Sequence, residues 1–457
     1  MRFTKFGKAF LMSALSAGVI FGLSSCVQSY TVGFLYVTGT NSATTSGNNG
    51  IISGFKIDHN KGKLTPINGL PVSTGGSNPV RAVLLSGGRF VYVLNRGVAA
   101  DGTANCSTTN VCSGSNITLF AVGGNGVLSS QGIAYYTQGK NPTRMFTDSS
   151  GNYLYVLDHD SPDNYSSTYN ASTNGCTLAL GAGVKTCGDI TVFQINSDTG
   201  RLSLVVNAQV TSASGSSLSY FPVPANPIDF AMSSSYVLTM SGTPSSGDSV
   251  FPYTYNAANG QLTVNSNGSQ SLGISAATTL VSTSSYVYVL DNEPTTSTLN
   301  GTTTTAPSGI LIYSTGTGGA LSLLSGGVIP GDSTLTNPIW LVTESKAKWA
   351  YVAYRGTNNT STQTQESGIA GWTIDSGTHL LTPEISGSPW GTGSGPACLL
   401  EDPSHQFFYT ANFSDSTVTG RALNTEAGTL TDLPGNANKA YPLDGPATWC
   451  VVSGRTS

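Results

Sequence analysis

The chain has 457 residues, of which only 9% are charged, and its formal net charge at pH 7 is -4. Glycine accounts for 55 residues, and serine, threonine and asparagine fill the gaps between short apolar runs. This composition favours strands and turns over helices and suits one large all-β ring as well as two or three smaller domains. It argues against a nucleic-acid partner, because the chain has no basic stripe to neutralise phosphates.

The N-terminus is a targeting segment rather than part of the fold. A positive region, Arg2, Lys5 and Lys8, precedes an apolar run over residues 9–22 that is short for a bilayer span. The following Leu23-Ser24-Ser25-Cys26 resembles a bacterial lipobox, which implies cleavage before Cys26 and lipidation of its thiol. Val27 after the cysteine favours the outer membrane. The alternative is an ordinary secretory signal with a chance cysteine. We expect a signal peptide at 1–25, a lipidated tether at 26–33 and one domain at 34–457.

Removing residues 1–25 takes away three basic groups and no acidic group, so the mature net charge becomes about -7. A cell-envelope location follows, with the lipid as the only membrane contact. No later segment is apolar enough to span a membrane.

A repeated turn dominates the rest of the chain. Six copies read Gly-x-Leu, and a seventh is stretched by one residue from Gly377 to Leu380. The leucines recur every 50 to 74 residues, which is the length of a four-stranded sheet with its loops. The strict copies start at Gly62, Gly126, Gly200, Gly260, Gly319 and Gly428.

Each repeat also contains an Asn-Pro or Gly-Pro start, a tight turn and an alternating apolar strand. Residues 141–204 show the frame, with "NPTRMFTDSSGNYLYVLDHD" followed by "DITVFQINSDTGRLSL". The first repeat lacks the inner strand and opens at Phe34, whereas the C-terminus supplies a spare one, "GPATWCVVSG", from Gly445. We therefore predict an all-β fold, a seven-bladed β-propeller of four-stranded antiparallel blades. The C-terminal strand pairs into the first blade, which removes the exposed sheet edges.

Six cysteines remain after lipidation, and an even number in an exported chain indicates disulfides. Cys106 and Cys112 share one loop, and Cys176 and Cys187 share another, so two local bridges are the simplest pairing. Cys398 and Cys450 lie at nearly equivalent places in adjacent repeats. They either pair or remain two buried free thiols.

Over residues 30–453 the chain resembles the lactonase-like seven-bladed propellers, which include 6-phosphogluconolactonase-type enzymes and "YVTN" repeat proteins. The resemblance rests on the Pro-led inner strand, the "LYVLD" and "ITVFQI" strands and the "DTGRL" turn. Enzymatic relatives carry a His in the third blade, where this chain has Thr143-Arg144-Met145. The resemblance specifies the fold better than the activity.

Two sets of positions should meet at the mouth of the central channel on the top face, where the inner strands begin. Charged side chains are enriched there, and the alternative to ligand binding is that they pair with one another. The predicted ligand-binding residues are Arg81, Arg144, Asp229, Arg96, Asp291, Arg355 and Trp340. Arginines at this density suit a carboxylate or phosphate.

Only one histidine, His159, falls on the top face, where Asp158 or Asp160 could orient it as a general base. The plain alternative is a solvated loop histidine. Asp158, Asp160, Asp163 and Asn164 lack the Gly and Glu of a calcium loop, and we expect no metal and no cofactor. The first hypothesis is a monomeric surface propeller that binds a small anionic ligand, a glycan or a protein. The second is a lactone hydrolase that uses His159 and Asp158.

Overall fold

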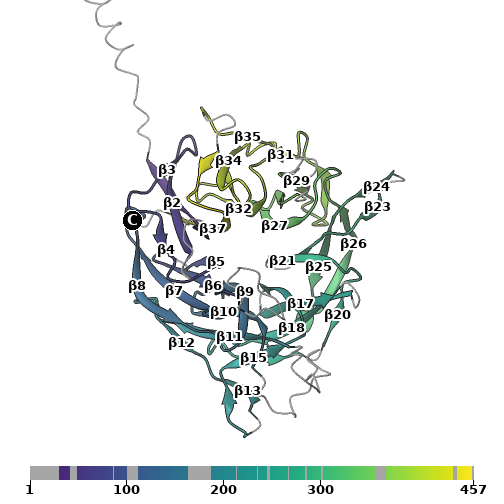
Figure 1. Ribbon diagram of the computed structural model, residues 1–457. Coiled ribbons are helices and arrows are strands. Elements are labelled where there is room, and N and C mark those ends of the chain that lie inside the picture. The colour runs from purple at the N-terminus through teal and green to yellow at the C-terminus, as the bar shows by residue number, and fades with distance from the viewer. Residues whose placement is uncertain are drawn as a thin grey trace, which may run out of the picture.

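The protein is a closed ring of seven β-sheets around a central axis (Figure 1). The computed structural model describes residues 30–41, 49–85, 87–99, 112–162, 187–212, 214–233, 235–243, 247–265, 267–283, 286–299, 302–356, 367–435 and 440–454. The described residues contain no α-helix, and their one helical element is the 3-10 turn η1 (Thr317–Gly319). The predicted seven-bladed fold is confirmed.

Each blade is a four-stranded antiparallel sheet, and neighbouring inner strands contact one another around the axis. The inner strands are β37 (Ala447–Gly454), β5 (Pro79–Leu84), β9 (Lys140–Thr147), β16 (Pro227–Ser233), β21 (Ala277–Ser282), β27 (Pro338–Thr343) and β32 (Pro396–Glu401). The second strands are β1 (Thr31–Thr40), β6 (Phe90–Asn95), β10 (Tyr153–Asp160), β17 (Tyr236–Thr243), β22 (Tyr286–Asp291), β28 (Trp349–Tyr354) and β33 (Phe407–Asn412).

The outer half of each blade is less regular, because most outer strands are short and resume after a loop. The third strands are β2 (Gly50–Asp58), β7 (Asn116–Val122), β11 (Gly188–Ile195), β18 (Gly247–Tyr255), β25 (Gly309–Thr315), β29 (Gly368–Ile374) and β34 (Thr417–Leu423). The fourth are β3 (Leu64–Pro66), β8 (Leu128–Tyr135), β12 (Leu202–Leu204), β19 (Leu262–Val264), β26 (Leu321–Pro330), β30 (Leu381–Glu384) and β35 (Leu430–Asp432).

Short further strands pair with the third strands of five blades, and two hairpins lie outside the blades. The added strands are β4 (Val72–Ser73), β15 (Tyr220–Val223), β20 (Gln270–Ser271), β31 (Trp390–Gly391) and β36 (Tyr441–Pro442). The hairpins are β13 (Asn207–Thr211) with β14 (Ser217–Leu218), and β23 (Thr295–Leu299) with β24 (Thr302–Ala306).

The Asn-Pro signature has a backbone cause. Asn78, Asn141, Asn226 and Asn337 all have φ between 50° and 56°, and Gly395 takes the same place with φ 66°. Asparagine and glycine are the residues that best tolerate this left-handed conformation. The side chains of Asn78 and Asn337 donate to the carbonyls of Gly97 and Gly356, just past the end of the second strand. The signature therefore fixes where each inner strand enters the top face.

The Gly-x-Leu turn packs one blade on the next. All six strict glycines have positive φ, and a Cβ at Gly260 would lie 2.4 Å from the Tyr153 ring of the preceding blade. Five second-strand tyrosines also donate to the carbonyl oxygens of these glycines, at 2.6–3.3 Å: Tyr36, Tyr92, Tyr155, Tyr351 and Tyr409. The turn thus serves both the backbone and the interface between blades.

The seventh copy of this turn differs from our prediction. Leu381, not Leu380, pairs with the third strand of its blade, and His379 takes the left-handed conformation with φ 60°. The spacing is therefore not stretched. In the other blades a glycine at this position lies against an aromatic ring. In this blade the His379 ring stacks on the Tyr286 ring, with 4.3 Å between the ring centroids.

The ring closes through the chain termini, as predicted. β1 lies between β2 and β37, so the first blade combines both ends of the chain. A disulfide between Cys398 on β32 and Cys450 on β37 joins the inner strands of the last and first blades. Cys112 and Cys187 are also disulfide-bonded, whereas Cys106 and Cys176 lie outside the described residues.

Cys26, the signal peptide and the tether up to Ser29 also lie outside the described residues, so these parts of the prediction stay untested. In the portion of the chain that the structure describes, no helix is long and apolar enough to cross a membrane.

Candidate functional site

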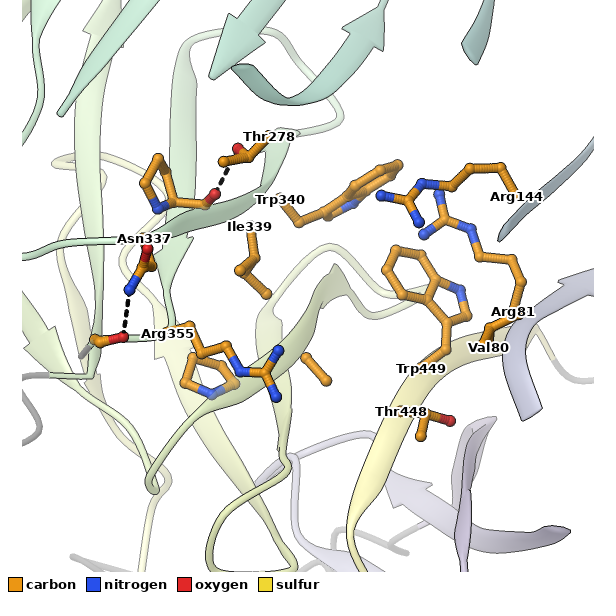
Figure 2. Close-up of a pocket in the computed structure, with 14 residues that line it drawn as sticks. Val80, Arg81, Arg144, Thr278, Asn337, Ile339, Trp340, Arg355, Thr448 and Trp449 are labelled. Carbon is orange, nitrogen blue, oxygen red and sulfur yellow. Dashed lines mark hydrogen bonds between the residues drawn. The ribbon is translucent and has the colours of Figure 1, made fainter. Parts of the chain in front are cut away.

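A cavity of about 630 Å³ opens on the top face, where the inner strands begin. Its lining comes from the inner strands of six blades and from the turn after β28 (Figure 2). The lining residues are Val80, Arg81, Arg144, Thr278, Asn337, Pro338, Ile339, Trp340, Arg355, Gly356, Pro396, Ala397, Thr448 and Trp449.

A β-bulge in every inner strand builds this lining. The register slips by one residue near the start of each strand, as between Pro79 and Arg81 and between Pro338 and Trp340. The same slip occurs in the other five blades. A bulge sets two successive residues against one partner and redirects their side chains. This is why pairs such as Ile339 and Trp340 both reach the cavity.

Arg81 is almost completely buried among aromatic rings. The residue is 3% exposed, and its guanidinium carbon lies 3.5 Å from the ring centroid of Trp449 and 4.7 Å from that of Trp340. The centroid of the Phe146 ring lies 4.8 Å from the same guanidinium carbon. Within the described part of the chain, the Nη2 atom of Arg81 has no hydrogen-bond partner. Burial, with the nearby positive charge of Arg144, lowers the pKa of Arg81 well below its usual value, and Asp229 acts in the opposite direction.

Arg144 is held by a carboxylate. Its Nε donates to Asp229 Oδ1 at 2.9 Å, and its Nη1 donates to the Thr143 carbonyl at 3.2 Å. The Arg144 side chain is 26% exposed and lines the cavity, whereas Asp229 is fully buried beneath it and does not. Figure 2 places the guanidinium groups of Arg81 and Arg144 together at one end of the cavity. The sequence alternative, in which charges pair with each other, therefore applies to Arg144 and Asp229.

Arg355 enters the cavity from another side, after the end of β28 (Figure 2). Its guanidinium carbon lies 4.9 Å from the Phe413 ring centroid, and burial lowers its pKa. The described lining thus carries three arginines and no acidic side chain. Such a lining gives the cavity a positive potential.

Besides Asp229, two further predicted ligand-binding residues, Arg96 and Asp291, do not line the cavity. The Nε of Arg96 is buried and has no hydrogen-bond partner among the described residues, and burial lowers the pKa of Arg96. Asp291, at the end of β22, is 2% exposed, and burial and Glu293 raise its pKa to about 6. Trp340 does line the cavity.

The predicted catalytic pair lies apart as well. The His159 ring contacts Asp160 Oδ1 at 2.9 Å and is absent from the cavity lining. Asp158 is fully buried and accepts from the Thr137 hydroxyl at 2.9 Å. Burial raises the pKa of Asp158 well above its ordinary value. Asp160, rather than Asp158, orients the histidine.

Sequence reasoning missed Trp449. Counting three residues from the Gly-Pro start at Gly445, as from Asn337 to Trp340, leads to Thr448, which also lines the cavity. The register pairs Ala447 with Gly39 and Trp449 with Thr38, so Trp449 is the equivalent of Trp340. Aligning the two tryptophans would have found it. Among the described residues, no group of three or more His, Cys, Asp and Glu could hold a metal ion.

Comparison with known proteins gives the same architecture. Residues 49–179 match the family model described as lactonase, 7-bladed beta-propeller. No curated protein sequence matches this chain.

Solved structures resemble the chain over almost its whole length. A putative 6-phosphogluconolactonase from Bacteroides fragilis is 14% identical, with a TM-score of 0.61 over 92% of this chain and 98% of that one. One from Bacteroides uniformis is 15% identical, with a TM-score of 0.61 over 93% and 100%. The periplasmic gluconolactonase of Pseudomonas aeruginosa is 15% identical, with a TM-score of 0.60 over 92% and 99%. At this level of identity the likeness concerns the fold.

Proposed function

Because the chain is a seven-bladed β-propeller whose residues 49–179 match the lactonase family model, we propose that it binds a small anionic ligand in its top cavity. One observation carries the proposal. Three arginines, Arg81, Arg144 and Arg355, line a cavity of about 630 Å³ whose described lining holds no carboxylate. A carboxylate or phosphate would satisfy these cations, since arginine donates to both in a bidentate geometry.

The size and walls of the cavity support a small molecule. Pockets of roughly 300–1,000 Å³ suit small ligands, and they combine apolar walls with a few polar groups. Here Trp340 and Trp449 supply aromatic surface, while Asn337 and Thr278 supply polar atoms. A glycan or a protein segment would have to present its anionic group at the same place.

Anion titration of the purified protein tests the proposal. Two of the five tryptophans line the cavity, so tryptophan fluorescence should change on adding inorganic phosphate or gluconate, and not on adding glucose. Arg144→Gln and Arg355→Gln should each weaken anion binding by about 10-fold or more. Arg89→Gln is the matched control, since Arg89 donates to the Asp198 carbonyl away from the cavity. Equal affinities in all four proteins would contradict the proposal.

Lactone hydrolysis is the second candidate, favoured by the family match and by the neighbours named as lactonases. The described cavity lining offers no histidine or carboxylate as a general base. If purified protein hydrolyses a lactone, His159→Ala should reduce the rate by about 100-fold for a general-base role. An unchanged rate would exclude His159 from the chemistry.

The cell-envelope location is also a proposal, which rests on the lipobox-like Leu23-Ser24-Ser25-Cys26. β1 begins at Thr31, only five residues after Cys26, so the tether reaches at most about 18 Å. Because β1 starts on the face opposite the cavity, a lipid on Cys26 would leave the cavity facing away from the membrane. Limited proteolysis of the lipidated protein on vesicles tests this orientation. Cleavage near Asn60 and Thr199 should be slower than in lipid-free protein, and faster cleavage there would reverse the orientation.

A further inference from the structure

The carboxylate of Asp229, beside the cavity, accepts four hydrogen bonds. Its side chain is fully buried on β16 of the fourth blade. Oδ1 accepts from Arg144 Nε and from the Phe230 N–H, both at 2.9 Å. Oδ2 accepts from the Thr279 hydroxyl at 2.5 Å and from the Leu280 N–H at 3.0 Å. The four donors come from three successive blades.

This arrangement needs a carboxylate. Each oxygen faces one backbone N–H, and backbone donors cannot turn away. An asparagine amide would point its NH2 group at one of them, because an amide has only one accepting atom. The fourth and fifth blades therefore fix the carboxylate, and the carboxylate in turn fixes the Nε of Arg144.

Without the bond to Asp229, electrostatic repulsion would push Arg144 away from Arg81. The buried guanidinium of Arg81 lies close by, and the two like charges repel each other. Arg81 has aromatic rings as neighbours, and no carboxylate of the described residues is hydrogen-bonded to it. Of the two arginines, Arg144 is the one that donates a hydrogen bond to Asp229.

We propose that Asp229 is a positioning residue, which holds Arg144 against the repulsion of Arg81 so that both guanidinium groups face one bound anion. The proposal rests on the anion-binding function proposed above. It assigns Asp229 no contact with the ligand, since the carboxylate lies outside the cavity lining.

The sign of one substitution separates positioning from simple neutralisation. If Asp229 only offsets positive charge, Asp229→Asn should strengthen binding of inorganic phosphate, because it removes a negative charge beside the site. If Asp229 positions Arg144, the same variant should weaken phosphate binding by about 10-fold, the loss expected for a charge-assisted bond. Affinity that is unchanged or higher in Asp229→Asn would overturn the proposal.

Asp248→Asn is the matched control. Asp248 is 1% exposed on the same blade and accepts the Ala277 N–H of the fifth blade at 2.7 Å. Its contacts with described residues include no arginine side chain. Phosphate affinity in this variant should stay within about twofold of wild type, because a buried carboxylate is lost without freeing an arginine. A tenfold loss in both variants would show a general effect of removing buried acids, and would also overturn the positioning role.

A second readout needs neither a ligand nor a foldable Asp229 variant. In ligand-free protein, the hydrogen-bonded Arg144 Nε–H should exchange slowly and give a protected arginine side-chain NMR signal. Arg144→Lys should remove that signal, and Asp248→Asn should retain it. If no protected signal depends on Arg144, the positioning role fails. If the signal is present but phosphate does not bind, the anion-binding function fails while the anchoring of Arg144 stands.

Discussion

The disulfide between Cys398 and Cys450 should carry a large share of the stability of the ring. It joins the inner strand of the seventh blade to β37, the strand that the C-terminus contributes to the first blade. β37 otherwise holds its place through backbone pairing with β1 and through packing. We predict that replacing both cysteines with alanine loosens this closure before any other interface.

The magnitude follows from the sequence separation of 52 residues. Constraining a loop of that length in the unfolded chain is worth about 4 kcal/mol at 25 °C in the chain-entropy treatment. Alanine is the better replacement, because both positions are buried, at 0% and 4% exposure, and a serine hydroxyl would have no assured partner. The lost sulfur atoms add about 1 kcal/mol through poorer packing.

Urea unfolding at pH 7, followed by tryptophan fluorescence and by circular dichroism, measures the effect. The double alanine variant should lose about 4–5 kcal/mol of unfolding free energy. Native-state hydrogen exchange should become faster in β37 and β1 than in the fourth and fifth blades. Wild type and variant, both unfolded with a reductant present, should match to within about 1 kcal/mol, because the reductant also breaks the disulfides of Cys112 and Cys187 in both proteins. A variant as stable as oxidised wild type, with uniform exchange around the ring, would refute this account of closure.

Four further predictions test other parts of the argument. Tyr409→Phe removes the hydrogen bond from the last blade to the Gly62 carbonyl at 2.6 Å and should cost about 1–2 kcal/mol by urea unfolding; no loss would make that bond dispensable. Gly260→Ala should cost about 3 kcal/mol or more of unfolding free energy, because its Cβ would lie 2.4 Å from Tyr153. Gly268→Ala should cost only about 1 kcal/mol, because Gly268 has φ 60° but open space around it. Equal losses in the two variants would show that backbone strain alone is the cause. Burial raises the pKa of Asp291 to about 6, so wild type should lose stability as the pH rises from about 4 to 6. Asp291→Asn should be more stable than wild type at pH 7, by at most about 3 kcal/mol, and no more stable at pH 4. A gain independent of pH would contradict the raised pKa of Asp291. Cys26→Ser should abolish palmitate labelling and membrane fractionation, and unchanged labelling would remove the lipoprotein proposal.

The architecture was readable from the sequence because it depends on local rules repeated many times. The left-handed turn before Leu64 needs a glycine at Gly62, and the same requirement returns in each blade. The unmatched strand at Gly445 then gave the blade count and the closure, since an unpaired strand at each end of the chain has one natural partner. Even here one copy was misread, because His379 takes the left-handed conformation in place of a glycine, and its ring stacks on Tyr286.

The candidate site was readable only in part. The sequence placed Arg81, Arg144, Arg355 and Trp340 at the mouth of the ring, because strand order alone brings those positions to the top face. The sequence could not show which predicted residues reach the cavity, since a one-residue bulge in each inner strand redirects the side chains there. Burial also removes others, such as Asp291, from the surface. The burial of Arg81 against Trp449 and the bond from Arg144 to Asp229 join different blades, so no local pattern records them. Spacing along the chain therefore determined the fold, while the register and packing between blades decided which charges are free to meet a ligand.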